Sequence, residues 1–163
     1  YSVSIAKDIK IVVDDIINIK SLYKLLRNWF SKLRYDYYEK EHIEDMKPED
    51  VKSLNIKMEA DKKVDDYTKF HIELRMKGND LRPVIRNNEL CIKGKVSINF
   101  EAFLENDYDG KWDTPFALKF FRTIHDKYIM SSKYDRNMSN LKDELDDLVN
   151  KAKSFLKVEE FKK

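Results

Sequence analysis

The chain has 163 residues, 42% of them hydrophobic and 38% charged, which suits one packed domain over residues 1–163 and argues against a disordered chain. Basic residues number 32 and acidic residues 30, so the net charge of +2 excludes a global field that would draw the protein onto nucleic acid or acidic membranes. The single cysteine, Cys91, excludes an internal disulfide and favours a reducing, cytoplasmic location.

The N-terminal part of the chain predicts a strand followed by a helix. It has neither an initiator methionine nor the apolar centre of a signal peptide, and no apolar run approaches the ~20 residues that span a bilayer, so we expect no export signal and no membrane span. Residues 9–17 form a β-branched run typical of a strand. Apolar residues then recur at three- and four-residue steps over 19–34, which predicts a helix with Asp14, Asp15 and Asn18 at its capped start.

The middle of the chain alternates apolar and polar residues. Residues 35–46 fit an extension of the preceding helix, an edge strand or a loop, and the sequence does not distinguish between these alternatives. The alternation predicts strands over residues 54–60 and 69–76, joined by a hairpin loop at 62–66. These strands would each have one apolar and one polar face.

Turn-forming residues divide the next segment. The runs at residues 78–80 and 87–88 predict two turns, and residues 81–85 between them read as a short edge strand interrupted by a proline. Alternation returns over residues 92–104, where Gly94 indicates a bulge.

Two further helices are expected after that strand. Asp113 or Thr114 caps the first, and Pro115 suits its first position. A polar break at residues 131–139 precedes the second, over residues 141–156. Its apolar stripe has heptad-like spacing that fits a partner helix, but the stripe is wide and favours packing within the domain. The elements together predict an α+β fold, an antiparallel sheet of four to five strands with one apolar face covered by about three helices.

The loop at residues 105–113 resembles a calcium-binding loop in one respect. It places carboxylates, including Asp107 and Asp109, at alternate positions before Gly110. However, Phe116 stands where such loops need a bidentate glutamate, and a strand precedes the loop. We therefore interpret it as an acidic turn between a strand and a helix and expect no metal or cofactor.

The three histidines, His42, His71 and His125, are dispersed and have no second histidine or cysteine at metal-ligand spacing. His71, Glu73 and Glu101 share the polar parity of the predicted sheet, where a histidine beside carboxylates can perform acid–base chemistry. Cross-strand ion pairs on a solvated face explain the same pattern. No catalytic assignment follows.

Tyr35, Tyr37 and Tyr38 follow a basic helix, a combination that can stack bases and neutralise phosphates. Acidic residues nearby balance the charge, and Trp29 reads as a core residue, so nucleic-acid binding is disfavoured. Glycine-rich phosphate loops are absent from the sequence.

The preferred functional hypothesis is therefore a non-enzymatic protein-interaction or assembly module, with a protein partner or a second copy of the chain. The alternative is a cavity for a small molecule or lipid between a curved sheet and its helices. A nucleic-acid-binding accessory protein comes third, and we lean away from an enzyme.

Overall fold

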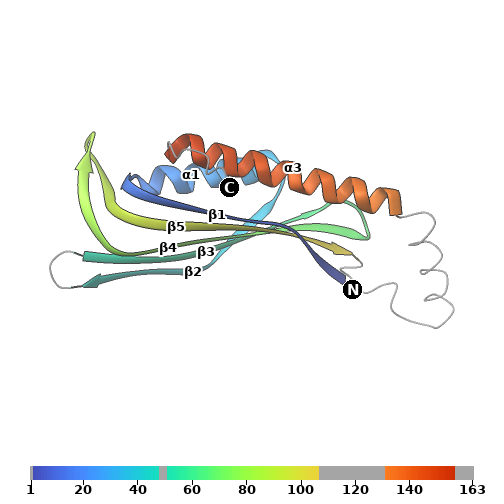
Figure 1. Ribbon diagram of the computed structural model, residues 1–163, viewed down its shortest axis with the longest axis horizontal. Coiled ribbons are helices and arrows are strands. Elements are labelled where there is room, and N and C mark those ends of the chain that lie inside the picture. The colour runs from blue at the N-terminus through green and yellow to red at the C-terminus, as the bar shows by residue number, and fades with distance from the viewer. Residues whose placement is uncertain (1, 48–50, 107–130, 157–163) are drawn as a thin grey trace.

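The computed structural model describes residues 2–47, 51–106 and 131–156, which form a five-stranded antiparallel sheet and two helices (Figure 1). The elements in chain order are β1 (Ser2–Ile17), α1 (Ile19–Lys32), β2 (Asp36–Lys47), β3 (Val51–Lys63), β4 (Thr68–Arg86), β5 (Glu89–Asn106) and α3 (Ser131–Leu156). The strand order is β1-β5-β4-β3-β2, so β2 to β5 form a meander and β1 returns beside β5. The predicted antiparallel sheet is confirmed.

Both helices lie along the same side of the sheet, with α3 packed on β1 and β5 (Figure 1). Alternate residues of the central strands are buried, as the period of two predicts. The buried positions are Leu54, Ile56, Met58 and Ala60 on β3, Phe70, Ile72, Leu74 and Met76 on β4, and Val96, Ile98, Phe100, Ala102 and Leu104 on β5. They belong to one core with Leu22, Leu26, Trp29 and Phe30 of α1 and with Leu141, Leu145, Leu148, Val149 and Ala152 of α3. Trp29 is thus a core residue, and α3 packs within the domain, as expected.

The first helix is confirmed and its cap is resolved. The side chain of Asn18 accepts a hydrogen bond from the backbone N–H of Ser21 at 3.1 Å. Asp14 and Asp15, which we also expected at the helix start, lie in β1 instead, because β1 pairs with β5 as far as Ile17. β1 begins at Ser2, well before the predicted strand.

The segment left open by the sequence, residues 35–46, lies almost wholly in β2. Arg34 adopts a left-handed backbone conformation, with φ of 64°, and ends the helical path. The backbone N–H of Tyr35 still donates to the carbonyl of Phe30 at 2.8 Å. β2 then pairs along β3 as an edge strand, the second of the three alternatives.

The turn predicted at residues 78–80 is wrong. β4 continues through it, and the register with β5 shifts between Gly78 and Arg82. Gly94 lies opposite this shift, so an irregularity occurs where the glycine indicated a bulge, but the extra residue is in β4 and not in β5. Turn-forming residues therefore bend the hairpin here and do not end the strand.

The end of β4 behaves as the predicted edge strand. Leu81 is its last residue paired with β3, and beyond it β4 pairs with β5 alone. This leaves one side of the strand without a backbone partner, which explains why Pro83 is accepted there. The predicted turn at residues 87–88 is confirmed, since Asn87 and Asn88 have φ of 54° and 62°, as a two-residue hairpin turn requires.

The polar break predicted at residues 131–139 is also wrong, because α3 starts at Ser131. The segment contains no glycine or proline, and Tyr134, Asn137 and Met138 contact or enter the core, so tertiary packing overrides its polar composition. The helix predicted after Pro115 and the acidic turn lie outside the described residues. Within the described residues, no helix is long and apolar enough to cross a membrane.

Acidic residues of α3 attach the helix to three other elements. Asp146 pairs with Lys7 of β1, and Glu144 pairs with Lys62 of β3. Asp147 accepts a hydrogen bond from the indole N–H of Trp29 at 2.8 Å. These contacts fix the rotation of the amphipathic helix over the sheet.

At the other end of α3, Lys133 lies 2.7 Å from Asp65 in the turn between β3 and β4. Oδ1 of Asp65 also accepts hydrogen bonds from the backbone N–H groups of Tyr67 and Thr68, at 2.8 and 2.7 Å. Burial alone would raise the pKa of Asp65, but the hydrogen bonds from Lys133 and the two amides outweigh it and lower the pKa.

We expect Asp65→Ala to lower the free energy of unfolding by about 2 kcal/mol, because two backbone donors lose their acceptor, and Asp65→Asn to cost less because it keeps an acceptor oxygen. A lowered folded pKa means that the ionised carboxylate stabilises the fold above the ordinary pKa of 3.8, and this contribution disappears as the pH falls through the folded value. Urea unfolding of the wild type and the Asp65→Asn variant should therefore differ at pH 7 and converge at the acid end. A constant difference would contradict the assignment.

Candidate functional site

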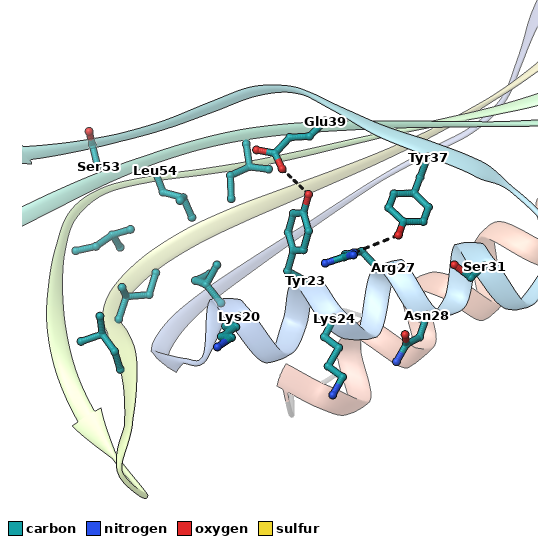
Figure 2. A pocket seen from close by; sticks show the side chains of 15 residues that line it. Lys20, Tyr23, Lys24, Arg27, Asn28, Ser31, Tyr37, Glu39, Ser53 and Leu54 are labelled. Atoms are coloured by element: carbon teal, nitrogen blue, oxygen red, sulfur yellow. Dashed lines mark hydrogen bonds between the residues drawn. The ribbon is translucent and has the colours of Figure 1, made fainter.

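A cavity of about 680 Å³ lies between α1, β2, β3 and the bent part of the β4–β5 hairpin (Figure 2). Its floor is apolar, and its rim is polar except for Leu90. Among the described residues, the floor consists of Leu54, Ile56, Leu81, Ile92 and Ile19, and the rim of Lys20, Tyr23, Lys24, Arg27, Asn28, Ser31, Tyr37, Glu39, Ser53 and Leu90. Leu54, Ile56 and Leu81 are buried while Lys20, Lys24 and Arg27 are exposed, so the cavity opens to solvent along α1.

The bend in the hairpin closes one end of this cavity. β4 and β5 curve toward the helix side of the sheet beyond the end of β3 (Figure 1). A Cβ atom at Gly78 would lie 3.0 Å from the Leu81 side chain, and one at Gly94, whose φ is 150°, would lie 2.8 Å from it. Leu81 therefore occupies the space that the two glycines leave, and this packing allows the strands to turn.

Arg27 is held between two tyrosines at the rim. Its guanidinium carbon lies 5.7 Å from the ring centroid of Tyr23 and 5.8 Å from that of Tyr37, within cation–π range. Its Nε donates to the hydroxyl of Tyr37 at 3.2 Å (Figure 2). In the part of the chain that the structure describes, its two terminal nitrogens have no hydrogen-bond acceptor. They are available to a ligand.

The two tyrosines differ in their acidity. Burial, together with the hydrogen bond that Tyr23 donates to Glu39, raises the pKa of Tyr23 to about 12. The hydrogen bond from Arg27 lowers the pKa of Tyr37. Glu39 accepts a hydrogen bond from Tyr23, and its single negative charge is outnumbered at the rim by three cations, Lys20, Lys24 and Arg27.

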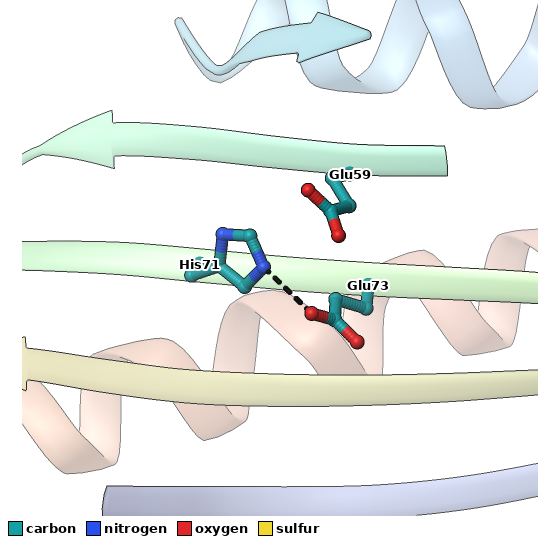
Figure 3. A group of neighbouring side chains, drawn as sticks. All are labelled: Glu59, His71 and Glu73. Carbon is teal, nitrogen blue, oxygen red and sulfur yellow. Dashed lines mark hydrogen bonds and ion pairs between the residues drawn. The ribbon is translucent and has the colours of Figure 1, made fainter. Parts of the chain in front are cut away.

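The opposite face of the sheet carries a polar cluster. On β3 and β4, Glu59 and Glu73 are Cα partners, as are Asp61 and His71. These residues have the parity opposite to the buried Met58 and Ile72, so they point away from the helices. One ligand-type atom from each of Glu59, His71 and Glu73 lies within 4.8 Å of the others (Figure 3).

His71 is placed between two carboxylates. Nδ1 contacts Asp61, and Nε2 lies 3.1 Å from Oε1 of Glu73. Burial would lower the pKa of His71, but the hydrogen bonds to Asp61 and Glu73 outweigh it and raise the pKa. Glu59 is buried and lies 3.4 Å from Nζ of Lys57. The cluster therefore joins an imidazole to three carboxylates on adjacent strands.

The residues singled out from the sequence are divided between these environments. Tyr35 is buried against Trp29 and donates to Glu144 at 3.2 Å, Tyr37 lines the cavity, and Tyr38 is exposed and donates to Asp61 at 3.3 Å. Because Tyr35 is buried and Tyr37 and Tyr38 lie in different environments, the three rings do not form one exposed surface. Glu101 is the Cα partner of Glu73 and accepts from Asn99 at 2.9 Å. Asp107 and Asp109 lie outside the described residues.

The sequence alone did not bring out Glu59, Asp61 or the floor of the cavity, although it singled out Tyr37 at the rim. Glu59 and Asp61 have the polar parity of a strand that was predicted, but only the register shows that they face Glu73 and His71. The cavity floor depends on the bend at Gly78 and Gly94, which the sequence predicted as a turn followed by a bulge. If the bend is not known, the sequence pattern places Leu81 only in a short edge strand.

Comparisons of the chain with protein-family models, with curated proteins and with solved structures found no match.

The contact between Arg27 and Tyr37 should be detectable in an absorbance titration of Tyr37. In the wild type, Tyr37 should ionise below the ordinary tyrosine pKa of 10.0, because Arg27 stabilises the phenolate. Arg27→Gln should return its pKa toward 10.0. Absorbance at the phenolate band, taken as the difference between each protein and its Tyr37→Phe version, isolates this group. An unchanged difference titration in the Arg27→Gln protein would contradict the contact.

Proposed function

We propose that the domain binds an amphipathic small molecule with an acidic group in the cavity beneath α1. The observation that carries the proposal is the combination of an apolar floor with a rim of three cations. The proposal selects the second of the hypotheses drawn from the sequence, the cavity between a curved sheet and its helices. It takes the sheet to have one apolar face under the helices, of which the cavity is the part left open.

The size and lining of the cavity support a ligand with an apolar body. A volume of about 680 Å³ falls within the range of 300–1,000 Å³ typical of small-molecule sites. The floor side chains of Leu54, Ile56 and Leu81 would cover an alkyl chain or ring system. The body of the ligand would lie toward the bent hairpin, because Leu81 and Ile92 come from that end.

The rim supports an acidic group at the other end of the ligand. The Arg27 guanidinium is oriented by its two tyrosines, so less conformational entropy is lost when it binds a carboxylate or sulfonate. Lys20 and Lys24 lie on the same face of α1, one turn apart. Glu39, the one carboxylate among the described lining residues, accepts from Tyr23.

The test compares two ligands that differ only in the head group, dodecanoate and dodecan-1-ol. Displacement of the fluorescent probe 1-anilinonaphthalene-8-sulfonate should show that the wild type prefers the acid. Arg27→Gln should weaken dodecanoate binding roughly tenfold, because a charge-assisted hydrogen bond is lost, and leave dodecan-1-ol binding nearly unchanged.

Arg75→Gln is the matched control, since Arg75 has the parity opposite to the buried Leu74 and Met76 and lies outside the cavity. It removes the same charge from the molecule and should alter neither affinity. Equal losses of dodecanoate affinity in the Arg27 and Arg75 variants would mean that net charge alone causes the effect, which would contradict the role of Arg27. Failure of both ligands to displace the probe would contradict the proposal.

The assembly module remains a second candidate because of two exposed apolar side chains. Ile85 and Leu90 are Cα partners at the tip of the β4–β5 hairpin and are 77% and 59% exposed. Adjacent apolar side chains on a protruding hairpin are suited to contact with another protein.

Light scattering after size exclusion tests this candidate. If the hairpin tip joins two copies, the wild type should have a mass above 19.6 kDa and Ile85→Asp should return it to that value. A wild-type mass of one chain at high protein concentration would contradict self-assembly through the tip.

A further inference from the structure

We propose that Glu59, His71 and Glu73 form a binding site for one divalent transition-metal ion of the zinc type, on the face of the sheet opposite the cavity. This inference is independent of the proposed cavity ligand. It departs from the expectation of no metal, which rested on the poor match of the loop at residues 105–113 to a calcium-binding loop and on the dispersed histidines.

The distances are close to those that a metal requires. Zinc held by imidazole and carboxylate ligands at about 2.0–2.2 Å places neighbouring ligand atoms roughly 3.3–3.6 Å apart. Nε2 of His71 is already 3.1 Å from Oε1 of Glu73, and Glu59 completes a set whose atoms lie within 4.8 Å of one another (Figure 3). Side-chain rotation closes the remaining gap, because all three residues are on two paired strands.

The imidazole is oriented for coordination through Nε2. Asp61 contacts Nδ1 of His71 from the opposite strand. In metal sites, the ligating histidine usually donates its second N–H to a carboxylate, which sets the tautomer and the ring orientation. Asp61 performs that function here, so Nε2 faces Glu73 and the neighbouring Glu59.

The arrangement of charges explains why a cation is favoured. Glu59 lies opposite Glu73, and Glu73 lies opposite Glu101, so three carboxylates follow one another across β3, β4 and β5. Like charges directly opposite on a sheet repel, and the repulsion is costly for Glu59, which is only 4% exposed. Lys57 offsets part of this charge. A divalent ion between Glu59 and Glu73 would offset more of it.

The site is also open to solvent, and its three protein ligands leave one coordination position of the metal for water. The side chains of His71 and Glu73 are 12% and 31% exposed, so an ion can enter from the solvent side. Three protein ligands leave the fourth tetrahedral position to water, as in catalytic zinc sites. Coordination replaces the hydrogen bond between His71 and Glu73 and requires the imidazole to be unprotonated at Nε2.

Isothermal titration with zinc chloride, on protein first treated with a chelator, tests the proposal. The wild type should bind one zinc ion per chain. His71→Gln and Glu73→Gln should each weaken binding at least tenfold, and Asp61→Asn should weaken it about tenfold through the orientation of His71. Glu73 is partly exposed, so its variant separates loss of a ligand from loss of the fold, which far-UV circular dichroism checks.

Glu101→Gln is the matched control, because Glu101 adjoins Glu73 in the same row of carboxylates but does not belong to the ligand set. Its zinc affinity should fall much less than that of Glu73→Gln, because the change removes a nearby negative charge but no ligand. Cobalt should give the visible absorption of a tetrahedral site in the wild type and in Glu101→Gln but not in His71→Gln. Zinc affinity equal in the wild type and His71→Gln, or an equal loss in Glu101→Gln, would overturn the proposal.

Discussion

The antiparallel register of β3, β4 and β5 is the constraint on which both candidate sites depend. It places Met58, Ile72 and the other buried side chains of these strands on the helix side of the sheet. Glu59, His71 and Glu73 lie on the opposite side. A slip of one residue would exchange the two sets, bury charges under α3 and separate Asp61 from His71. The buried parity makes that slip very costly, so the core that stabilises the fold also positions the outer cluster.

The cavity depends on a departure from that regular register. Where β4 and β5 shift between Gly78 and Arg82, the hairpin turns toward the helices and Leu81 fills the space over two glycines. α1 supplies the other wall, because one side of the helix enters the core through Leu22 and Leu26 while Tyr23 and Arg27 remain at the edge. A single amphipathic helix therefore contributes to the core and to the rim of the cavity.

α3 shows how charge refines a position that apolar packing leaves loosely defined. Its apolar stripe would permit small rotations over β1 and β5, but Lys7, Lys62 and Trp29 bind acidic residues on its flank. These contacts are partly buried, where ion pairs and hydrogen bonds are screened less by solvent. They join α3 to β1, β3 and α1, elements that lie far from it in the sequence.

The sequence by itself determined the local structure wherever one periodic signal was unopposed: the helix capped by Asn18, the alternating strands around Ile56, Ile72 and Ile98, and the Asn87–Asn88 turn. It failed where local residues carried a weak or conflicting signal, at residues 35–46, 78–80 and 131–139. Only tertiary structure decided those segments, because strand pairing turned a glycine-containing run into a bulge and core contacts made a polar run helical. The same holds for Glu59 opposite Glu73 and for Arg27 between two tyrosines, since cross-strand register and the approach of β2 to α1 are contacts between distant parts of the chain.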